Sequence, residues 1–395
     1  MNIKIHRGEN QIGGSIIEIS SQTTKVLFDV GLELVDDRNK TLPKIEGLFD
    51  YKGFDAIVIS HYHSDHLGLV YKVNHDIPLF LGEKSYKIIA ASDRYKHVKT
   101  ISPTGFLKHN VSFYIGDIKI TPFLCDHSAF DSYMLLAESE GESILYSGDF
   151  RSNGRKPFKW LLNQLPNNVD TLICEGTTLS REGYVVQTEV DLENEAIRLF
   201  KDCTGPIFVL QSSMNIDRIV TMYRAAKRTG RIFLEELYMA EIVNAIGDNI
   251  PNPLDFSDVK VFVTKYYDPK SSRYLLFDKF GNKKISESII SSTRFVMCVR
   301  SSMIKYLKSL NKKMSFENGF LIYSFWGGYK HKPEMKRFLD DCEKMGLRIV
   351  DLHTSGHADE DTIRQLIDKV SPKRILPIHT EYANWFRKNY GNQCQ

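Results

Sequence analysis

The first half of the chain alternates short apolar runs with turns that are polar or contain glycine. Runs of this length, rich in β-branched residues, predict strands. We expect nine of them before residue 180, which read in order NIKIHRG, SIIEIS, KVLFDVG, AIVIS, IPLFLG, IKITPFLC, SYMLLAE, SILYSG and TLICEG. The pattern therefore predicts a strand-rich layer at the start of the chain.

From residue 189 onward, apolar positions recur every three to four residues, which is the period of an amphipathic helix. This spacing predicts helices over 189–203, 215–229, 239–247, 333–346 and 359–370. Buried-strand patterns lie among them, including GPIFVLQ, RIFLE, VKVFVT, RFVMCV and GFLIYSF, and the chain ends with the strands RIVDL and RILPIH. Strands that alternate with helices are typical of an α/β fold.

The change of pattern divides the chain into three segments. We expect a first domain made of residues 1–188 and 351–395, with a second, α/β domain inserted at 189–350. A chain of 395 residues is long enough for two well-buried cores.

Composition limits the class of protein. A hydrophobic content of 42% and a charged content of 26% are those of a globular domain. The start, MNIKIHRGENQIGGS, lacks the features of a signal peptide, and no apolar stretch approaches the length that spans a bilayer. We therefore expect a cytoplasmic protein with no membrane partner. Its six cysteines include no C-x-x-C pair, which argues against a disulfide framework or a zinc ribbon.

The formal charge of +3 hides an uneven distribution. Residues 260–337 carry 17 Lys and Arg against 5 Asp and Glu. The same block contains many aromatic residues, among them Tyr266, Tyr267, Tyr274, Phe277, Tyr306, Tyr323, Trp326 and Tyr329. Cations neutralise phosphates and exposed rings stack on bases, so the block favours single-stranded nucleic acid as a partner. A solvated basic face over buried aromatic residues is the alternative.

The polar segment after the strand AIVIS concentrates metal-binding chemistry. His61, His63, Asp65 and His66 fall within six positions on the turn that leaves this strand. Imidazole nitrogens and carboxylate oxygens suit Zn²⁺ or Mn²⁺, and such a spacing can direct some side chains at one ion and the rest at another. A solvated loop rich in histidine is the alternative. Because H-x-H-x-D-H is rare in a chain with 12 His, the metal site is favoured.

Four more polar residues each follow an apolar run. They are His127 in PFLCDHS, Asp149 in SILYSGD, Glu175 in TLICE and His379 in RILPIH. Taken singly, each is more often a turn or core residue than a ligand. Strand ends at one edge of a sheet converge in space, so we expect these residues to join the histidine cluster in one ligand set.

Two further segments are candidates for phosphate binding. In DLHTSGHADE, His353 and His357 flank Ser355 and Gly356 ahead of a predicted helix. Backbone N–H groups of such a turn can hold a phosphate, and an N-cap loop is the equal alternative. In YSFWGGYKHKPE, Ser324 could approach a phosphate backbone, although a turn that ends a strand is the favoured interpretation.

These residues, in this order, resemble the metallo-β-lactamase fold and, within it, the β-CASP nucleases such as RNase J. HYHSDH matches the signature histidine motif, and CDHSAFDSYM and YSGDFR match the third and fourth motifs. Glu175 in LICEGT, His357 in HTSGHA and His379 in LPIHTE match the positions specific to β-CASP proteins. The resemblance covers residues from about 10 to 385. The loop YSFWGGYKHKPE departs from the family's glycine-rich loop, which leaves a 5′-phosphate pocket undecided.

The resemblance implies a metallo-β-lactamase αββα sandwich with an inserted α/β β-CASP cap, and a hydrolase with two Zn²⁺ ions. His61, His63 and His127 would hold one ion, Asp65, His66 and His379 the other, and Asp149 would bridge them. Activated water would attack phosphorus, and His357, oriented by Glu175, would protonate the leaving oxygen. Ser355, Gly356 and His353 would lie beside the neighbouring phosphate. Mn²⁺ suits the same ligands.

The implied function is a zinc-dependent ribonuclease, an endonuclease or exonuclease, that hydrolyses phosphodiester bonds of single-stranded RNA. A histidine at the position of His379 accompanies RNA-active members of the family. The alternatives are a DNA nuclease on the same fold, a small-molecule hydrolase of lactones or thioesters, and a non-catalytic RNA-binding subunit. Only 16 residues follow His379, so we expect the further domain of RNase J to be absent, and the oligomeric state stays open.

Overall fold

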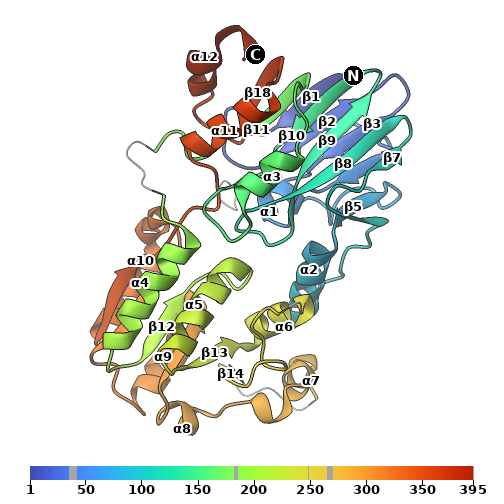
Figure 1. Cartoon of the computed structure of the whole chain (residues 1–395). Helices are drawn as coiled ribbons and strands as arrows, with labels where there is room; N and C mark the ends of the chain where they lie inside the picture. Colours follow the sequence, from blue (N-terminus) through green and yellow to red (C-terminus); the bar gives the residue numbers. More distant parts are fainter. Residues whose placement is uncertain (35–41, 182–185, 248, 265–269, 395) are drawn as a thin grey trace. The chain divides into compact units, whose positions relative to one another are not determined.

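The computed structural model describes residues 1–34, 42–181, 186–247, 249–264 and 270–394. Within these ranges the chain forms two compact units (Figure 1). The first unit contains residues 1–89, 100–186 and 356–395, and the second contains 90–99 and 187–355. Residues 90–99 therefore belong to the second unit, although the sequence pattern had assigned them to the first domain. The domain boundaries at 188/189 and 350/351 stay predictions.

Two six-stranded sheets build the first unit. The first sheet keeps chain order, with β1 (Asn2–Arg7), β2 (Ile16–Ser20), β3 (Lys25–Phe28), β4 (Ala56–Val58), β5 (Leu79–Gly82) and β6 (Gly105–Leu107). The second has the order β18 (Arg374–Ile378), β11 (Thr171–Glu175), β10 (Glu142–Tyr146), β9 (Ser132–Ser139), β8 (Ile118–Cys125) and β7 (Phe113–Ile115). All nine strands predicted in this half are present, and the three-residue strands β6 and β7 are additional.

The core of the first unit lies between its two sheets. Side chains of Val26 and Val58 from the first sheet and of Leu135 and Ile173 from the second belong to one buried cluster. On the other face of the second sheet, buried apolar residues pack against the helices α3 (Phe158–Gln164), α11 (Glu360–Val370) and α12 (Asn384–Tyr390) (Figure 1).

The outer face of the first sheet is covered as well. Leu27, Ile57 and Leu81 alternate with the core-facing positions and have no exposed surface. The helices α1 (Ser64–Leu67) and α2 (Glu83–Lys96) follow strands of this sheet. The predicted αββα sandwich is therefore confirmed.

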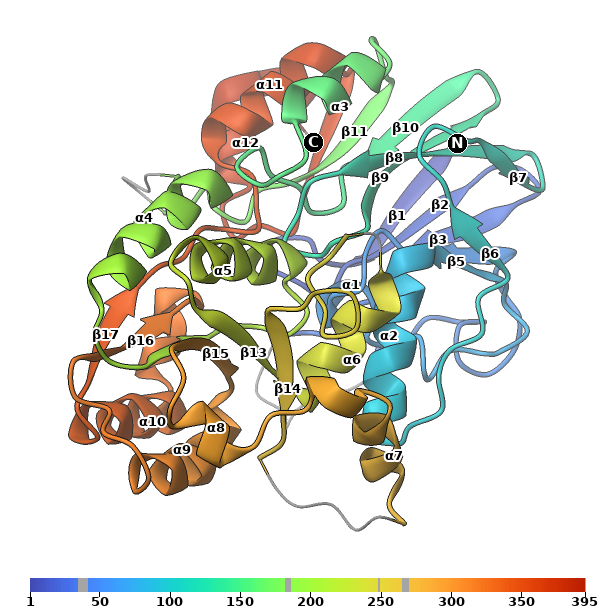
Figure 2. The same ribbon diagram turned by 60° about the horizontal axis from the view of Figure 1, so that its bottom comes forward.

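A six-stranded, all-parallel sheet forms the centre of the second unit. Its order is β14 (Val259–Phe262), β13 (Ile232–Glu236), β15 (Phe295–Val299), β12 (Ile207–Leu210), β16 (Gly319–Tyr323) and β17 (Leu347–Asp351). The helices α4 (Glu189–Asp202), α5 (Ile216–Arg228), α6 (Leu237–Ile246), α7 (Ser272–Asp278), α8 (Glu287–Ile290), α9 (Ile304–Asn311) and α10 (Pro333–Lys344) connect or follow its strands (Figure 2). Short 3₁₀ turns lie at Gly281–Lys283, Ser301–Met303, Gly327–His331 and, in the first unit, Gly391–Gln393. The predicted inserted α/β domain is confirmed.

Local sequence explains where the predicted helices begin and end. The Thr188 side chain accepts a hydrogen bond from Asp191 N and starts α4, and Asp359 accepts from Thr362 N and starts α11. Ser371 ends α11 in a left-handed conformation with φ of 42°. All five helices predicted from periodicity are present to within about two residues at either end.

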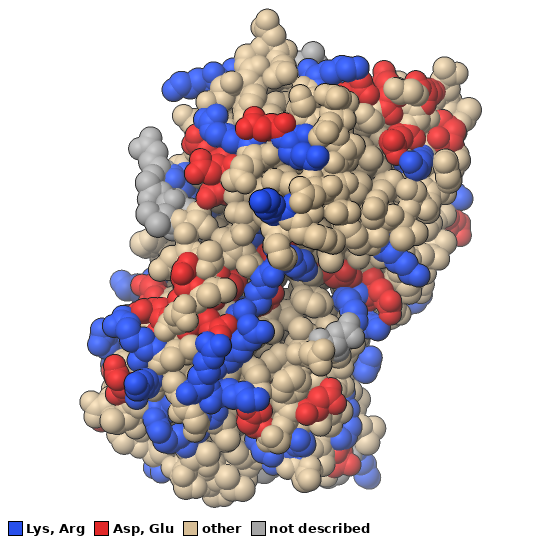
Figure 3. Space-filling model, viewed as in Figure 1, with Lys and Arg blue, Asp and Glu red and all other residues tan. Residues whose placement is uncertain are grey.

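Figure 3 shows Lys and Arg side chains interspersed with acidic ones over the face of the second unit that carries α4 and α5. Several of these cations form ion pairs, including Arg198 with Glu195 and Arg228 with Glu193. This part of the surface is therefore mixed in charge rather than uniformly basic.

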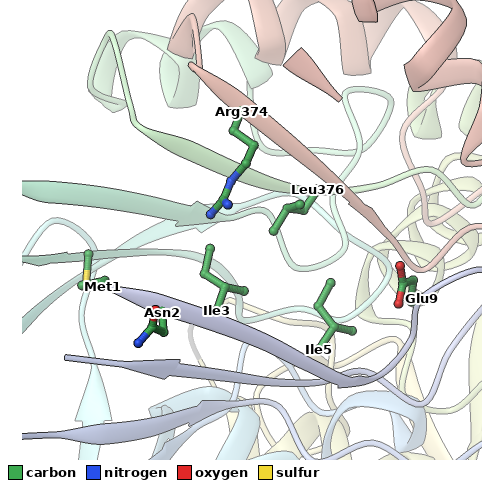
Figure 4. Close-up of a pocket in the computed structure, with 7 residues that line it drawn as sticks. All are labelled: Met1, Asn2, Ile3, Ile5, Glu9, Arg374 and Leu376. Atoms are coloured by element: carbon green, nitrogen blue, oxygen red, sulfur yellow. The ribbon is translucent and has the colours of Figure 1, made fainter. Parts of the chain in front are cut away.

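A groove of about 340 Å³ lies between the edge strands β1 and β18 of the first unit (Figure 4). Ile3 and Ile5 of β1 face Leu376 and Arg374 of β18 across it. None of the candidate metal-binding residues lines this groove.

Candidate metal centre

Strand directions explain why residues far apart in sequence meet. In the second sheet, β10, β11 and β18 are parallel, and β9 is antiparallel to both β8 and β10. The carboxyl ends of β8, β10, β11 and β18 therefore share one edge. His127, Asp149, Glu175 and His379 each lie at such an end or within three residues of it.

The other sheet contributes the histidine cluster. Strand β4 ends at Val58, and the four predicted ligands follow it, with Asp65 and His66 on the one-turn helix α1. His61, His66 and Asp149 form one group whose ligand atoms all lie within 4.8 Å of one another. The other groups that meet this criterion are His61, His63 and His127; Asp65, His66 and His379; and Asp149, Glu175, His357 and His379. The seven predicted metal ligands are thus brought together.

Asp149 lies at the centre of this arrangement. Its Oδ2 is 3.2 Å from His66 Nε2 and 3.8 Å from Nε2 of each of His61, His127 and His379. Because this oxygen faces four of the predicted imidazole ligands, which belong to both predicted sets, Asp149 would help to hold either ion.

The two flanking groups differ in composition. His127 Nε2 is 3.1 Å from His63 Nδ1. His379 Nε2 is 3.2 Å from Asp65 Oδ2. One group is thus made of imidazoles alone and the other includes a carboxylate.

Hydrogen bonds at Nδ1 orient the imidazoles. His61 Nδ1 lies 3.0 Å from Ser60 Oγ, and His66 Nδ1 lies 2.7 Å from Asp29 Oδ2. His379 Nδ1 lies 2.7 Å from Thr177 Oγ1. His127 Nδ1 contacts the carbonyl oxygen of Gly356. With Nδ1 engaged in this way, each ring presents Nε2 to the centre, which is how metal-binding histidines are held.

Whether a metal ion fits the centre can be judged from the hydrogen bonds of its buried polar atoms. Within the described part of the chain, His61 Nε2, His66 Nε2 and both Asp149 carboxylate oxygens are buried and make no well-directed hydrogen bond. Burying such groups without partners costs free energy that a bound cation would offset. Nitrogen and carboxylate donors at this spacing fit Zn²⁺, and Mn²⁺ shares the preference.

Burial and charge set the protonation of the centre. Burial lowers the pKa of His61 and His127, and it lowers the pKa of His63 to about 4, so these rings are neutral and able to bind metal. Burial alone would raise the pKa of Asp149, but the surrounding imidazoles, above all His379 and His66, outweigh it and hold that pKa well below its usual range. Asp149 is therefore ionised.

Glu175 and His357 form a pair beside the metal ligands. His357 Nδ1 is 3.1 Å from Glu175 Oε2 and 3.5 Å from Asp149 Oδ2. Burial would lower the pKa of His357, but the two carboxylates outweigh it, and the pKa is raised. The backbone N–H of Phe150 donates to Glu175 Oε1 at 2.9 Å and fixes that carboxylate.

The four predicted substrate-binding residues are divided between the units. Gly356 belongs to the first unit, where a Cβ atom would lie 2.4 Å from Ser128 Oγ, so a side chain does not fit beside His127. Ser324, His353 and Ser355 belong to the second unit. The Ser324 hydroxyl donates to the Leu352 carbonyl at 2.6 Å and is also contacted by Arg218, so it stabilises that unit.

Three residues that orient the ligands were not found from the sequence. They are Ser60, Asp29 and Thr177. Asp29 follows the strand KVLF and so shares the position, just after an apolar run, that identified His127 and Asp149. Asp29 and the ligand His379 both have positive φ, of 60° and 53°. Such backbone strain is concentrated at functional sites.

Two family models match the sequence. The model of the beta-lactamase superfamily domain matches residues 24–211. The model of the Zn-dependent metallo-hydrolase RNA specificity domain matches residues 344–394. The first match contains six of the seven predicted metal ligands, and the second contains His379.

Curated relatives are distant but match over most of this chain. Ribonuclease J of Sinorhizobium meliloti is 21% identical over 361 residues, which are 87% of this chain and 61% of that protein. Ribonuclease J of Mycoplasma genitalium is 22% identical, covering 98% of this chain and 69% of the relative. Ribonuclease J of Helicobacter pylori is 20% identical, and the aligned region covers 95% of this chain and 55% of that relative. The chain thus spans between about half and two thirds of the length of these relatives.

A solved structure shares the fold. A protein of unknown function from Enterococcus faecalis superposes with a TM-score of 0.80 at 21% identity, covering 98% of this chain and 96% of that one. Among the described residues, no helix is both long and apolar enough to cross a membrane.

Proposed function

We propose that this chain is a metallo-hydrolase of the beta-lactamase superfamily that hydrolyses the phosphodiester bonds of single-stranded RNA, because the two family models match residues 24–211 and 344–394. The domain model at residues 344–394 supports RNA as the substrate. The distant similarity to proteins named ribonuclease J supports nuclease activity. The observation that carries the proposal is the Glu175–His357 pair beside a full set of metal ligands.

Seven side chains would hold two divalent ions. His61, His63 and His127 would bind one ion and Asp65, His66 and His379 the other, with Asp149 contacting both. Two such ions, when bound, supply Lewis acidity that activates water and offsets charge on a reacting phosphate.

The chain's own residues would do the remaining work. His357 carries a proton more readily than an ordinary imidazole because Glu175 and Asp149 face it, as its raised pKa indicates. We assign it the role of proton donor to the leaving oxygen. Glu175, fixed by Phe150 N, would hold the ring in position. A general acid suits the departure of a poor leaving group such as the ribose oxygen of RNA.

The test is a matched cleavage assay. End-labelled single-stranded RNA and DNA of the same sequence are incubated with Zn²⁺, with Mn²⁺ or with chelator. We expect metal-dependent cleavage of RNA, and the ladder of products separates endonuclease from exonuclease action. Cleavage of DNA in preference to RNA would favour the DNA nuclease. Failure to cut either polymer, with hydrolysis of lactones or thioesters, would contradict the proposal.

Two variants test the role of His357. His357→Ala should lower the rate of RNA cleavage by about 100-fold to 10,000-fold, which is the usual contribution of a general acid. His75→Ala is the matched control, since His75 is exposed and outside the centre. Metal content, measured by mass spectrometry, should be equal in both variants. A His357→Ala protein with two ions and full activity would remove His357 from the mechanism.

A further inference from the structure

The aromatic residues of the basic block 260–337 differ widely in exposure. Tyr306 and Tyr323 are buried, with 5% and 0% of their surface exposed, whereas Trp326 is 47% and Tyr329 is 40% exposed. Tyr274 and Phe277 are half-buried, and Tyr266 and Tyr267 lie outside the described residues. Of the described aromatic residues named from this block, Trp326 and Tyr329 are thus the two best able to stack on a ligand.

Some of the 17 cations of the block form ion pairs. Six of them contact acidic side chains, in the pairs Lys279–Glu241, Lys284–Asp278, Arg300–Glu236, Lys308–Asp341, Lys313–Glu287 and Lys330–Asp351. The excess charge counted from the sequence is therefore partly neutralised. A nucleic-acid surface must be sought where exposed rings and cations coincide.

They coincide in residues 326–332, which we call the aromatic loop. We propose that this loop is a stacking platform for the bases of single-stranded RNA. This inference rests on the proposed function, which gives single-stranded RNA as the substrate. The rings of Trp326 and Tyr329 meet edge to face, with centroids 5.5 Å apart and planes at 85°. Stacking on such rings tolerates any base, because every base has a π face.

Two contacts hold Trp326 in place without a ligand. A Cβ atom on Gly328 would lie 2.3 Å from Cη2 of Trp326, so the indole packs directly against the glycine backbone. Tyr323, whose ring is buried, donates its hydroxyl hydrogen to the Trp326 carbonyl at 3.1 Å. A ring held in this way loses little conformational entropy on binding.

A cation lies over the Tyr329 ring, and two more basic side chains belong to the loop. The Lys332 ammonium lies 4.7 Å from the centre of the Tyr329 ring, and within the described residues it has no ion pair. Lys330 lies 4.8 Å from the Tyr323 ring and is held by Asp351. His331 is exposed between them. Exposed rings beside a cation form the combination that binds bases and phosphates of a single strand.

The loop also occupies the edge of the sheet where ligands bind. It follows β16, whose two neighbours β12 and β17 are both parallel to it, so it lies at the carboxyl ends of these strands. Open parallel sheets bind their ligands at this edge. His353, which follows β17, lies at the same edge with Nδ1 3.3 Å from the Ser324 carbonyl oxygen.

Binding of RNA is measured by fluorescence anisotropy with the metal-loaded protein. The probes are fluorescein-labelled 12-mers of adenosine and of uridine, with 2′-O-methyl phosphorothioate backbones that resist hydrolysis. Trp326→Ala should weaken binding of the adenosine 12-mer by about 5-fold to 150-fold, the effect of losing one stacked base. The adenosine probe should lose more than the uridine probe, because purines stack more strongly.

Three further variants separate stacking from structure. Trp326→Phe keeps a ring and should retain part of the affinity. Gly328→Val keeps every aromatic residue but displaces the indole, and it should weaken binding as Trp326→Ala does. Trp160→Ala is the matched control, because Trp160 is an equally exposed tryptophan, 42%, in α3 of the first unit.

The outcomes distinguish the two proposals. If Trp326→Ala binds both probes within twofold of wild type, the platform is wrong even where the wild-type protein cleaves RNA. If the wild-type protein binds RNA through Trp326 but cleaves none, the platform stands and the proposed function fails. An equal loss in Trp160→Ala would show a non-specific effect and overturn the platform.

Discussion

The carboxylate of Asp29 accepts a hydrogen bond from Nδ1 of His66 at 2.7 Å, although neither residue has any exposed side-chain surface. The same carboxylate accepts from Ser60 N at 2.7 Å and from the Tyr146 hydroxyl at 2.8 Å. Asp29 thus joins strand β3, the histidine turn and strand β10. It fixes which nitrogen of His66 faces the metal centre.

Asp29→Asn should therefore weaken metal binding without changing a ligand. The amide retains the size of the carboxylate but loses its charge, and loss of such a partner typically costs 10-fold to 100-fold in metal affinity. Competition with a chromophoric zinc chelator measures the effect. Asp117→Asn is the control, since Asp117 accepts hydrogen bonds from Ser21, Thr23 and Thr24 away from the ligands. Equal zinc affinities in the two variants would contradict the role given to Asp29.

Metal removal should lower the thermal stability of the protein. Chelation leaves His61, His66 and Asp149 with buried atoms that lack partners. At 100 times its Kd, a bound ion stabilises the folded state by about 2.7 kcal/mol. For a unit of about 200 residues this corresponds to roughly 5–10 °C in Tm. Scanning fluorimetry with chelator, and then with Zn²⁺ restored, measures the shift.

The matching control for metal removal is Asp149→Asn, which loses the charge that faces four imidazoles. We expect restored Zn²⁺ to raise the Tm of the wild-type protein by more than that of this variant. An identical response would mean that the ions bind elsewhere.

Two arginine–glutamate pairs of the second unit should differ sharply in their contribution to stability. Arg218 and Glu189 are fully buried with nitrogen and oxygen 3.0 Å apart, whereas Arg198 pairs with Glu195 at the surface. Arg218→Ala leaves a buried carboxylate without its cation and should cost about 3–5 kcal/mol. Arg198→Ala should cost less than about 1 kcal/mol. Urea unfolding followed by circular dichroism compares them, and similar losses would refute the distinction.

A buried carboxyl of strand β13 should make stability depend on pH. Glu235 is fully buried, and within the described residues neither carboxylate oxygen has a hydrogen-bond partner, so burial raises its pKa well above 4.5. The folded state then binds a proton that the unfolded state has released. Glu235 therefore lowers stability progressively as the pH rises from the unfolded pKa towards the folded one.

Glu235→Gln removes this effect, because the amide is neutral throughout. We expect its free energy of unfolding, relative to wild type, to be higher at pH 8 than at pH 5, with urea midpoints as the measurement. Glu343→Gln, at an exposed position of α10, should show no such change. A Glu235→Gln effect that is the same at both pH values would mean that the carboxyl is ionised in the folded protein.

Periodicity was enough to predict the long elements, and residue chemistry was enough to name the side chains that the fold brings together as candidate ligands. The helices α4, α5 and α11 have apolar stripes and polar caps that are local in sequence. The ligands share one signal, a polar residue after an apolar run, which holds for His127 and Asp149 alike. Short elements such as β6 and β7 were missed because three residues are too few to display a period.

Tertiary structure alone decided how the site is held. Asp29 is 37 positions from His66, and Thr177 is 202 positions from His379, so no local pattern relates them. The carbonyl of Gly356 contacts His127, which is 229 positions away in the sequence. The sequence by itself determined which side chains can bind a metal, because that is a property of each residue. Which atom of each faces the centre depends on hydrogen bonds between distant segments, and these exist only once the sheets have packed.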